Sequence, residues 1–244
     1  MLYGVFSDVH ANYEALKAVL AFFRENKVSR FICCGDLVGY GSQPAECVRE
    51  VMGLPGLSIV LGNHDAAVIG KIELRWFNHN ARAAIEFAGK KLSADELAYL
   101  AALPETVKTG DFTLVHGSPR QPLTEYLLSE TNFMENLACW ETSPCFMGHS
   151  HMPVYFRVSG GFPPETDFLR PMSKVMLDGV RYMLNPGSVG QPRDGNPRAS
   201  CGLYDPRKKI FELFRLDYDF LKTQELMKSV GLPQMLIERL SFGL

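Results

Sequence analysis

Residues 2–10 read LYGVFSDVH, an apolar run that ends in two side chains able to bind a metal. Leu2–Phe6 predicts a buried strand, and the apolar spacing of residues 11–26 predicts a helix after it. The same order returns along the chain, with strands expected at 31–34 and 59–61 and a helix at 44–52. Such alternation is typical of an α/β fold with a parallel sheet.

The second half of the chain is richer in predicted strands. Helices are expected at 73–90 and after Ser93, which forms a capping box with Glu96. Residues 106–109 and 112–116 predict a hairpin. Further short strands are expected at 146, 154–158, 175–177, 182–184, 201–204 and 210–216, with a loop insertion from 160 and a closing helix at 219–230. Because no linker-like segment divides the chain, residues 1–244 are predicted to form a single domain.

The composition narrows the class of function. The chain has 25 Lys and Arg against 27 Asp and Glu, a net charge of −2, so a broad nucleic-acid interface is not indicated. No apolar run approaches the roughly 18 residues of a membrane span, and no signal-peptide pattern opens the chain. The six cysteines form no CxxC pair and are expected to be buried thiols. We therefore expect a cytoplasmic protein without a membrane partner, while its oligomeric state, including a homo-oligomer, stays open.

Polar side chains follow the predicted strands at their carboxyl ends. Five of the six histidines occupy such positions, with His79 as the exception. Since the carboxyl ends of parallel strands meet at one crevice, these side chains are expected to converge. The converging set is Asp8, His10, Asp36, Asn63, His64, His116, His149 and His151.

With His64 set aside, seven candidate ligands remain, too many for one tetrahedral ion. They suit two ions that share a carboxylate, and a set of Asp, Asn and His without thiolate favours Mn, Fe, Zn, Co or Ni. Asp8 and His10 lie two residues apart, so in an extended strand their side chains would face the same side and bind one ion. His149 and His151 are expected to bind different ions.

Two neighbouring divalent ions are the usual arrangement for phosphoryl hydrolysis. A hydroxide that bridges the ions would attack phosphorus, and the ions would neutralise the charge that develops on the phosphoryl oxygens. His64 is the candidate acid for the leaving group, because imidazole titrates near neutral pH. Asp65 either orients His64 or caps the next turn.

The chain resembles the calcineurin-like metallophosphoesterase superfamily. The likeness rests on Asp8-x-His10, Gly35-Asp36-x-x-Gly39, Gly62-Asn63-His64-Asp65, His116-Gly117 and Gly148-His149-x-His151, and the turn at 185–190 is similar to one in its small prokaryotic phosphodiesterase branch. The resemblance implies a four-layer α/β/β/α sandwich, two packed mixed β-sheets flanked by helices. It also implies one ion held by Asp8, His10 and His151, a second held by Asn63, His116 and His149, Asp36 between them, and His64 acting on the leaving group.

One motif of this chain differs from the corresponding motif of the protein phosphatases and dinucleoside-tetraphosphate hydrolases of this superfamily. They carry Asp-Arg-Gly where this chain reads Gly39-Tyr40-Gly41, which favours a phosphodiesterase acting on small phosphate esters or nucleotides. Arg193 is the candidate clamp for the phosphate, or else a solvated loop arginine. Asn12 either hydrogen-bonds the substrate or caps the first helix, and we favour the cap.

Two rival functions stay open on the sequence. A non-catalytic metal-binding module on the same fold, like the retromer subunit of this architecture, would be expected to lose ligands or the catalytic histidine, and this chain keeps them all. A nuclease would be expected to show a basic strip beside the site, and the charge balance argues against one.

Overall fold

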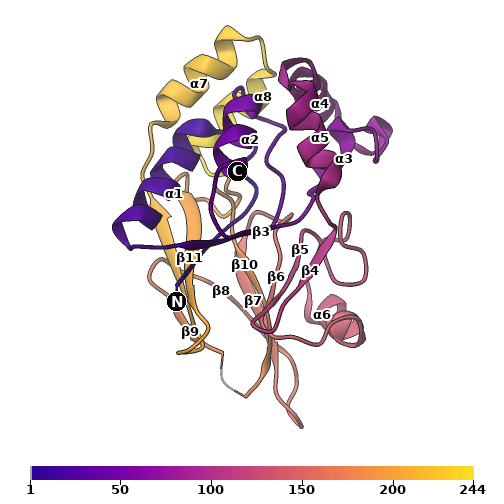
Figure 1. Cartoon of the computed structure of the whole chain (residues 1–244), viewed down its shortest axis with the longest axis vertical. Coiled ribbons are helices and arrows are strands. Elements are labelled where there is room, and N and C mark those ends of the chain that lie inside the picture. Colours follow the sequence, from indigo (N-terminus) through magenta and orange to yellow (C-terminus); the bar gives the residue numbers. More distant parts are fainter. Residues whose placement is uncertain (1, 178) are drawn as a thin grey trace.

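The computed structural model describes residues 2–177 and 179–244 and contains two six-stranded sheets (Figure 1). The strand order of the first sheet is β3 (Leu57–Ile59), β2 (Arg30–Cys33), β1 (Tyr3–Phe6), β11 (Ala199–Asp205), β12 (Ile210–Leu216) and β9 (Lys174–Met176). The strand order of the second sheet is β4 (Thr106–Lys108), β5 (Thr113–Val115), β6 (Cys145–Phe146), β10 (Arg181–Pro186), β7 (Pro153–Val158) and β8 (Glu165–Phe168).

Both sheets are mixed. β1, β2 and β3 are parallel, as the alternation of strands and helices predicts, whereas β11, β12 and β9 join this sheet in antiparallel pairings. In the second sheet β5, β6 and β10 are parallel, and β4, β7 and β8 are antiparallel to their neighbours. The predicted fold class of two mixed sheets flanked by helices is confirmed, and the antiparallel strands all come after residue 105.

Apolar contacts hold the layers together. Between the sheets, Val5 of β1 and Phe211 of β12 share a buried cluster with Phe146 of β6. On the outer face of the first sheet, α1 (Tyr13–Glu25) buries Phe23 in a second cluster. On the outer face of the second sheet, Phe133 of α6 (Glu130–Asn136) packs in a third. Figure 1 shows α6 beside β4 and β5, apart from the other helices.

The remaining helices surround the upper end of the first sheet in Figure 1. They are α2 (Pro44–Met52), α3 (Asn63–Val68), α4 (His79–Lys91), α5 (Ala94–Ala102), α7 (Phe220–Ser229) and α8 (Gln234–Glu238), with the short 3-10 helices η1 (Leu74–Trp76) and η3 (Arg239–Ser241). A further 3-10 helix, η2 (Leu137–Cys139), directly follows α6. The bounds of α2 are those predicted. The capping box before α5 is confirmed, because the Ser93 N–H donates to Glu96 Oε2 at 2.7 Å.

The helix predicted at 73–90 is wrong in its first turn. Asn78 Oδ1 accepts a hydrogen bond from the Ala81 N–H at 2.9 Å, so Asn78 is the N-cap of α4 and that helix begins at His79. The preceding residues form η1 instead. This break leaves Trp76 and Phe77 outside the helix, on a connection between α3 and α4.

The loop insertion expected from residue 160 is wrong in part. It contains β8, which pairs antiparallel with β7 at the edge of the second sheet. All of its residues are exposed, so no alternation of apolar and polar residues marks the strand in the sequence. α3, α6 and α8 were also missed, because helices of five to seven residues carry little periodicity.

The structure bears on the expectations for the cysteines and for membrane-spanning segments. All six cysteines are free, and five are buried as expected, whereas Cys139 is exposed. In residues 2–177 and 179–244, no helix is both long and apolar enough to cross a membrane.

Candidate metal centre

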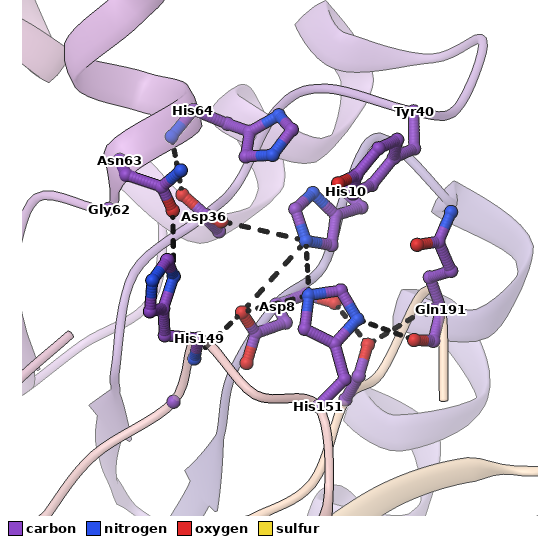
Figure 2. A network of polar contacts seen from close by, with 12 residues as sticks. Asp8, His10, Asp36, Tyr40, Gly62, Asn63, His64, His149, His151 and Gln191 are labelled. Carbon is purple, nitrogen blue, oxygen red and sulfur yellow. Dashed lines mark hydrogen bonds and ion pairs between the residues drawn. The ribbon is translucent and has the colours of Figure 1, made fainter. Parts of the chain in front are cut away.

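The polar side chains that follow the strands meet at one place between the two sheets. They come from the ends of β1, β2 and β3 in the first sheet and of β5 and β6 in the second. Figure 2 shows members of this set from the loops after β1, β2, β3 and β6 pointing toward one another. All eight members of the predicted set are buried, namely Asp8, His10, Asp36, Asn63, His64, His116, His149 and His151.

The backbone at the centre is unusual. Asp8, His10, Asp36, His149 and His151 have φ between 48° and 67°, in the left-handed region that non-glycine residues seldom adopt. The expectation that Asp8 and His10 lie on an extended strand is therefore wrong, because each residue turns the chain sharply. Their side chains still converge, and hydrogen bonds from their N–H groups to the carbonyls of the loop after β2, both 3.0 Å long, hold the two turns.

One group of possible ligands consists of Asp8, His10 and His151. The two Nε2 atoms of the histidines lie 3.0 Å apart, and Asp8 Oδ1 lies 3.5 Å from His151 Nε2. Both Nδ1 atoms contact backbone carbonyls, at 3.0 Å to Val38 and at 2.6 Å to Gln191. If each Nδ1 carries the proton for these contacts, both Nε2 lone pairs face the same point.

A second group consists of Asn63, His116 and His149. Asn63 Oδ1 lies 2.9 Å from His116 Nε2 and 3.0 Å from His149 Nδ1. The other ring nitrogen of His116 contacts the Cys34 carbonyl at 2.8 Å, which leaves Nε2 directed into the group. The predicted division of His149 and His151 between two groups thus agrees with their positions, and Ser150 between them accepts a hydrogen bond from Asn185.

Asp36 lies between the two groups. Its Oδ2 is 3.5 Å from His10 Nε2 and 3.4 Å from His116 Nε2, while its Oδ1 accepts a hydrogen bond from the His64 N–H at 2.9 Å. One carboxylate oxygen therefore faces an imidazole nitrogen of each group. This is the position that a shared ligand of two ions must have.

The electrostatics of the site favour a bound cation. Burial raises the pKa of Asp8 to about 7 and raises the pKa of Asp36 well above its usual range, with Asp65 adding to the second shift. Burial also lowers the pKa of His10 and His151 well below the usual value, with neighbouring cationic groups adding to the effect. Imidazole lone pairs and carboxylates buried together without compensating charge are costly, and divalent cations match both kinds of group. The residues present thus fit the metals expected of this donor set.

His64 lies at the edge of the cluster. Its ring packs at centroid distances of 4.8 Å from His10, 4.5 Å from Tyr40 and 5.1 Å from Phe77. Its Nδ1 is buried without a hydrogen-bond partner among the described residues. Burial and the nearby His116 lower the pKa of His64 well below the usual value. His64 therefore lies beside both groups with its Nδ1 directed at Gly39, and its side chain also lines the cavity next to Asn63 and His149.

Asp65 fastens turns and does not orient His64. Its Oδ1 accepts hydrogen bonds from the N–H groups of Leu37 and Val38 at 2.9 and 3.1 Å, and its Oδ2 accepts one from Gly62 at 3.2 Å. Of the two alternatives left open by the sequence, the turn is the one observed. Through these bonds Asp65 joins the loop after β2, which carries Asp36, to the first turn of α3, which carries His64.

Arg193 reaches the cluster from the loop after β10. It is half-buried, and its Nη2 donates to the Tyr40 hydroxyl at 3.2 Å and to Gln191 Oε1 at 3.1 Å. Its guanidinium lies 5.7 Å from the Tyr40 ring centroid. This position differs from that of a solvated loop arginine and leaves the charge beside the first group of ligands.

The side-chain amide of Asn12 makes hydrogen bonds within the fold. Its Oδ1 accepts the Ala15 N–H at 3.2 Å, and its Nδ2 donates to the Gly190 carbonyl and to the Tyr218 hydroxyl. The favoured interpretation as the cap of α1 is confirmed, and because the amide is buried and fully bonded, contact with a substrate is not supported. His79, the histidine outside the set, is exposed at the start of α4.

Some residues near the centre were missed by sequence reasoning. Gln191 orients His151 through its carbonyl, and Tyr126 stacks on His149 with ring centroids 3.8 Å apart. Asn185, noted only as part of a similar turn, donates to the Gly148 carbonyl at 2.6 Å and so supports the loop of both ligand histidines. These residues lie in loops without periodicity, and only the turn at 185–190 gave a signal.

The chain is similar to known proteins along its whole length. Residues 1–209 match the calcineurin-like phosphoesterase superfamily domain. The protein MJ0912 of Methanocaldococcus jannaschii is 37% identical over 246 residues, covering 98% of this chain and 97% of its own. The crystal structure of a metallophosphoesterase from Sphaerobacter thermophilus superposes with a TM-score of 0.89 at 39% identity, covering 100% of this chain and 99% of that one. The structure of PH1004 from Pyrococcus horikoshii shares the fold, with a TM-score of 0.82 at 19% identity and coverage of 99% and 98%.

Proposed function

Because the chain belongs to the calcineurin-like phosphoesterase superfamily, we propose that it is a phosphodiesterase that uses two divalent transition-metal ions to hydrolyse small phosphate esters or nucleotides. Family membership supports the hydrolysis of phosphoesters and the use of divalent metals. The observation that carries the finer proposal is the position of Asp36. Its Oδ2 faces one nitrogen from each of two groups of buried ligands, at 3.5 and 3.4 Å.

The proposed ligands divide between the two groups. Asp8, His10 and His151 would hold one ion, Asn63, His116 and His149 the other, and Asp36 both. When bound, two such ions acidify water and neutralise the charge on phosphoryl oxygens. Backbone carbonyls fix the ring orientation of His10, His116 and His151, so these three side chains are positioned before metal arrives.

His64 would protonate the leaving oxygen. Its ring packs against His10 of the first group and lines the cavity beside Asn63 and His149 of the second. The lowered pKa makes a proton on His64 easy to give up, and the negative charge of a bound diester favours the protonated form before the reaction. Proton transfer to the leaving alcohol is the step that such a group accelerates.

Arg193 would bind a phosphoryl oxygen. The guanidinium already faces the cluster and is held by Tyr40 and Gln191, so little side-chain freedom is lost on binding. A single guanidinium suits the single negative charge of a phosphodiester. Tyr40 stands where the protein phosphatases of the superfamily carry the arginine of Asp-Arg-Gly, and this difference also favours a diester over a phosphoprotein.

The proposal is tested on metal-stripped protein reloaded in turn with Mn, Ni, Zn, Co and Mg. We expect hydrolysis of bis(p-nitrophenyl) phosphate to exceed that of p-nitrophenyl phosphate with at least one transition metal. Elemental analysis should find two ions per chain, and fewer in Asp36→Asn. Asp95→Asn is the matched control, because Asp95 is exposed on α5.

Three results would contradict the proposal in different ways. Preference for the monoester would make the protein a phosphatase. Metal binding without hydrolysis of either ester would favour a non-catalytic binding module, and cleavage of DNA in preference to both esters would favour a nuclease. An unchanged stoichiometry in Asp36→Asn would refute the shared ligand.

A further inference from the structure

A cavity opens directly beside the second group of proposed ligands. It has a volume of about 550 Å³, which lies within the range of small-molecule sites, and Asn63, His64 and His149 form its inner wall. Its outer wall is the connection between α3 and α4 that contains η1. A group attached to a phosphate at the metal centre would extend into this space on the side of His64.

Aromatic rings line the cavity. Trp76 on η1 is 76% exposed, an unusual state for a tryptophan on a folded chain. Tyr126 faces it from the second half of the chain, with its ring stacked on His149 at an interplanar angle of 25°. Phe77 packs edge-on against His64 and completes the floor. Rigid aromatic faces of this kind bind flat rings at little entropic cost.

The charged groups at the rim have partners within the protein. Lys71 Nζ lies 2.6 Å from a carboxylate oxygen of Glu105, and Glu73 lies 2.8 Å from Arg75. One cation and one anion therefore line the cavity, each already paired, and a second phosphate would find no concentrated positive charge there. The outer part of the cavity therefore suits an uncharged group, whereas the charge of Arg193 lies next to the metal centre, where Arg193 hydrogen-bonds Tyr40 and Tyr126.

On these grounds we propose that the cavity between η1 and Tyr126 binds the leaving group of the substrate, and that this group carries a flat aromatic ring such as a nucleobase. The inference rests on the proposed phosphodiesterase function and names its substrate class. The oxygen of a water molecule forms a bond to phosphorus as the bond from phosphorus to the leaving oxygen breaks. The leaving oxygen takes the proton from His64, the water gives up a proton to solvent, and the product alcohol, a nucleoside, leaves through the cavity. Trp76 is then a specificity-determining residue that stacks on the base.

The tryptophans allow binding to be measured without catalysis. The chain has two, and Trp140 is only 2% exposed, so a ring that stacks in the cavity should quench Trp76. We expect adenosine to quench the fluorescence of metal-free protein, and ribose to leave it unchanged. Trp76→Phe should lose the signal and retain affinity by calorimetry, and Trp76→Ala should weaken binding about 5- to 10-fold, the lower part of the range for base stacking.

Phe162→Ala is the matched control, because Phe162 is 69% exposed and lines a different cavity. It should bind adenosine as the unmodified chain does. Equal quenching by ribose and adenosine, or unweakened binding of adenosine by Trp76→Ala, would overturn the inference.

A kinetic comparison separates this inference from the proposed function. With the active metal bound, Trp76→Ala should lose about 5- to 10-fold in kcat/KM on a dinucleoside monophosphate, whose leaving alcohol is a nucleoside, and keep its rate on glycerophosphocholine, a diester without a ring. If Trp76→Ala hydrolyses both substrates with the same ratio of kcat/KM values as the unmodified chain, the proposed aromatic cavity is refuted and the proposed phosphodiesterase function stands. If no metal gives hydrolysis of any diester while adenosine still quenches Trp76, the proposed function fails and the binding cavity stands.

Discussion

Replacing Gly39 with alanine tests where His64 must lie. Gly39 has a φ of +88°, and a Cβ added there would lie 2.3 Å from His64 Nδ1 and 2.9 Å from its Cγ. The methyl group and the ring cannot occupy these positions together. The ring has little room to move, because Tyr40 and Phe77 pack against it at centroid distances of 4.5 and 5.1 Å.

Gly70 supplies a control for the backbone strain in this variant. It has a φ of +76° and no atom within 4 Å of an added Cβ, so Gly70→Ala carries only the strain of a left-handed alanine, about 1–2 kcal/mol. Gly39→Ala adds the displacement of a buried side chain, which costs roughly 1–3 kcal/mol. We therefore expect Gly39→Ala to lower the free energy of unfolding by about 2–5 kcal/mol, and by more than Gly70→Ala does.

Thermal unfolding, elemental analysis and kinetics together check this reasoning. Gly39→Ala should keep two ions per chain, because the added Cβ clashes with His64 and contacts none of the proposed ligands directly, and should lose about 100-fold in kcat on diesters with poor leaving groups. Adding His64→Ala removes the clash, so the double variant should regain stability without regaining activity. If Gly39→Ala is as stable as Gly70→Ala and fully active, the close contact with His64 has no functional role.

Three further predictions concern individual side chains of the centre. His64→Ala should retain both metals and lose most activity on poor leaving groups, and an equal loss on good and poor leaving groups would exclude proton donation. Arg193→Ala should reduce kcat/KM for diesters about 10- to 100-fold, with Arg193→Lys recovering only part because lysine lacks the planar fork, and an unchanged kcat/KM would place Arg193 outside the phosphate site. The pKa of Asp8, raised to about 7, means that its carboxyl is mostly protonated at pH 6 and ionised at pH 9 in the metal-free protein. Metal binding should therefore release about one proton more at pH 6 than at pH 9, the difference coming from this carboxyl, as calorimetry in buffers of different ionisation enthalpy can measure, and equal release at both pH values would contradict the raised pKa.

The convergence of the polar side chains could be predicted because it depends on a strong signal. A run such as Leu2–Phe6 is long and apolar enough to mark a buried strand, and the residues directly after such a strand must lie at the sheet end. The hydrophobic pattern did not predict the left-handed backbone of Asp8 and His10, because the spacing of apolar residues carries no information about the φ of single residues. It also failed for β8, whose exposed residues carry no apolar pattern, and for α3, where Gly62 precedes a helix too short to be periodic.

The cavity beside the metal centre could not be predicted from the residues that follow the strands. Trp76 belongs to a segment that the sequence predicts as helix, where its exposure would have no particular meaning. Its position outside the helix follows from the hydrogen bond of the N-cap Asn78, because α4 begins only at His79, three residues after Trp76. Tyr126 comes from a loop of the second half, so the two aromatic walls are brought together only by the packing of the sheets.

The left-handed residues explain how the centre is held before any ion binds. Each turns the chain back over the strand end and costs about 1–3 kcal/mol, so five of them require support from the surrounding fold. That support crosses between loops: the Asp8 carbonyl accepts hydrogen bonds from Ser188 Oγ at 2.8 Å and from the Gly190 N–H at 2.9 Å, and the His149 N–H donates to Asp8 Oδ1 at 3.2 Å. Since Asp8 follows a strand of the first sheet and His149 a strand of the second, sheet packing fixes the distances between ligands. Folding therefore holds the Nε2 atoms of His10 and His151 3.0 Å apart without a cation between them. A cation bound there would relieve the repulsion between the two lone pairs that the fold imposes.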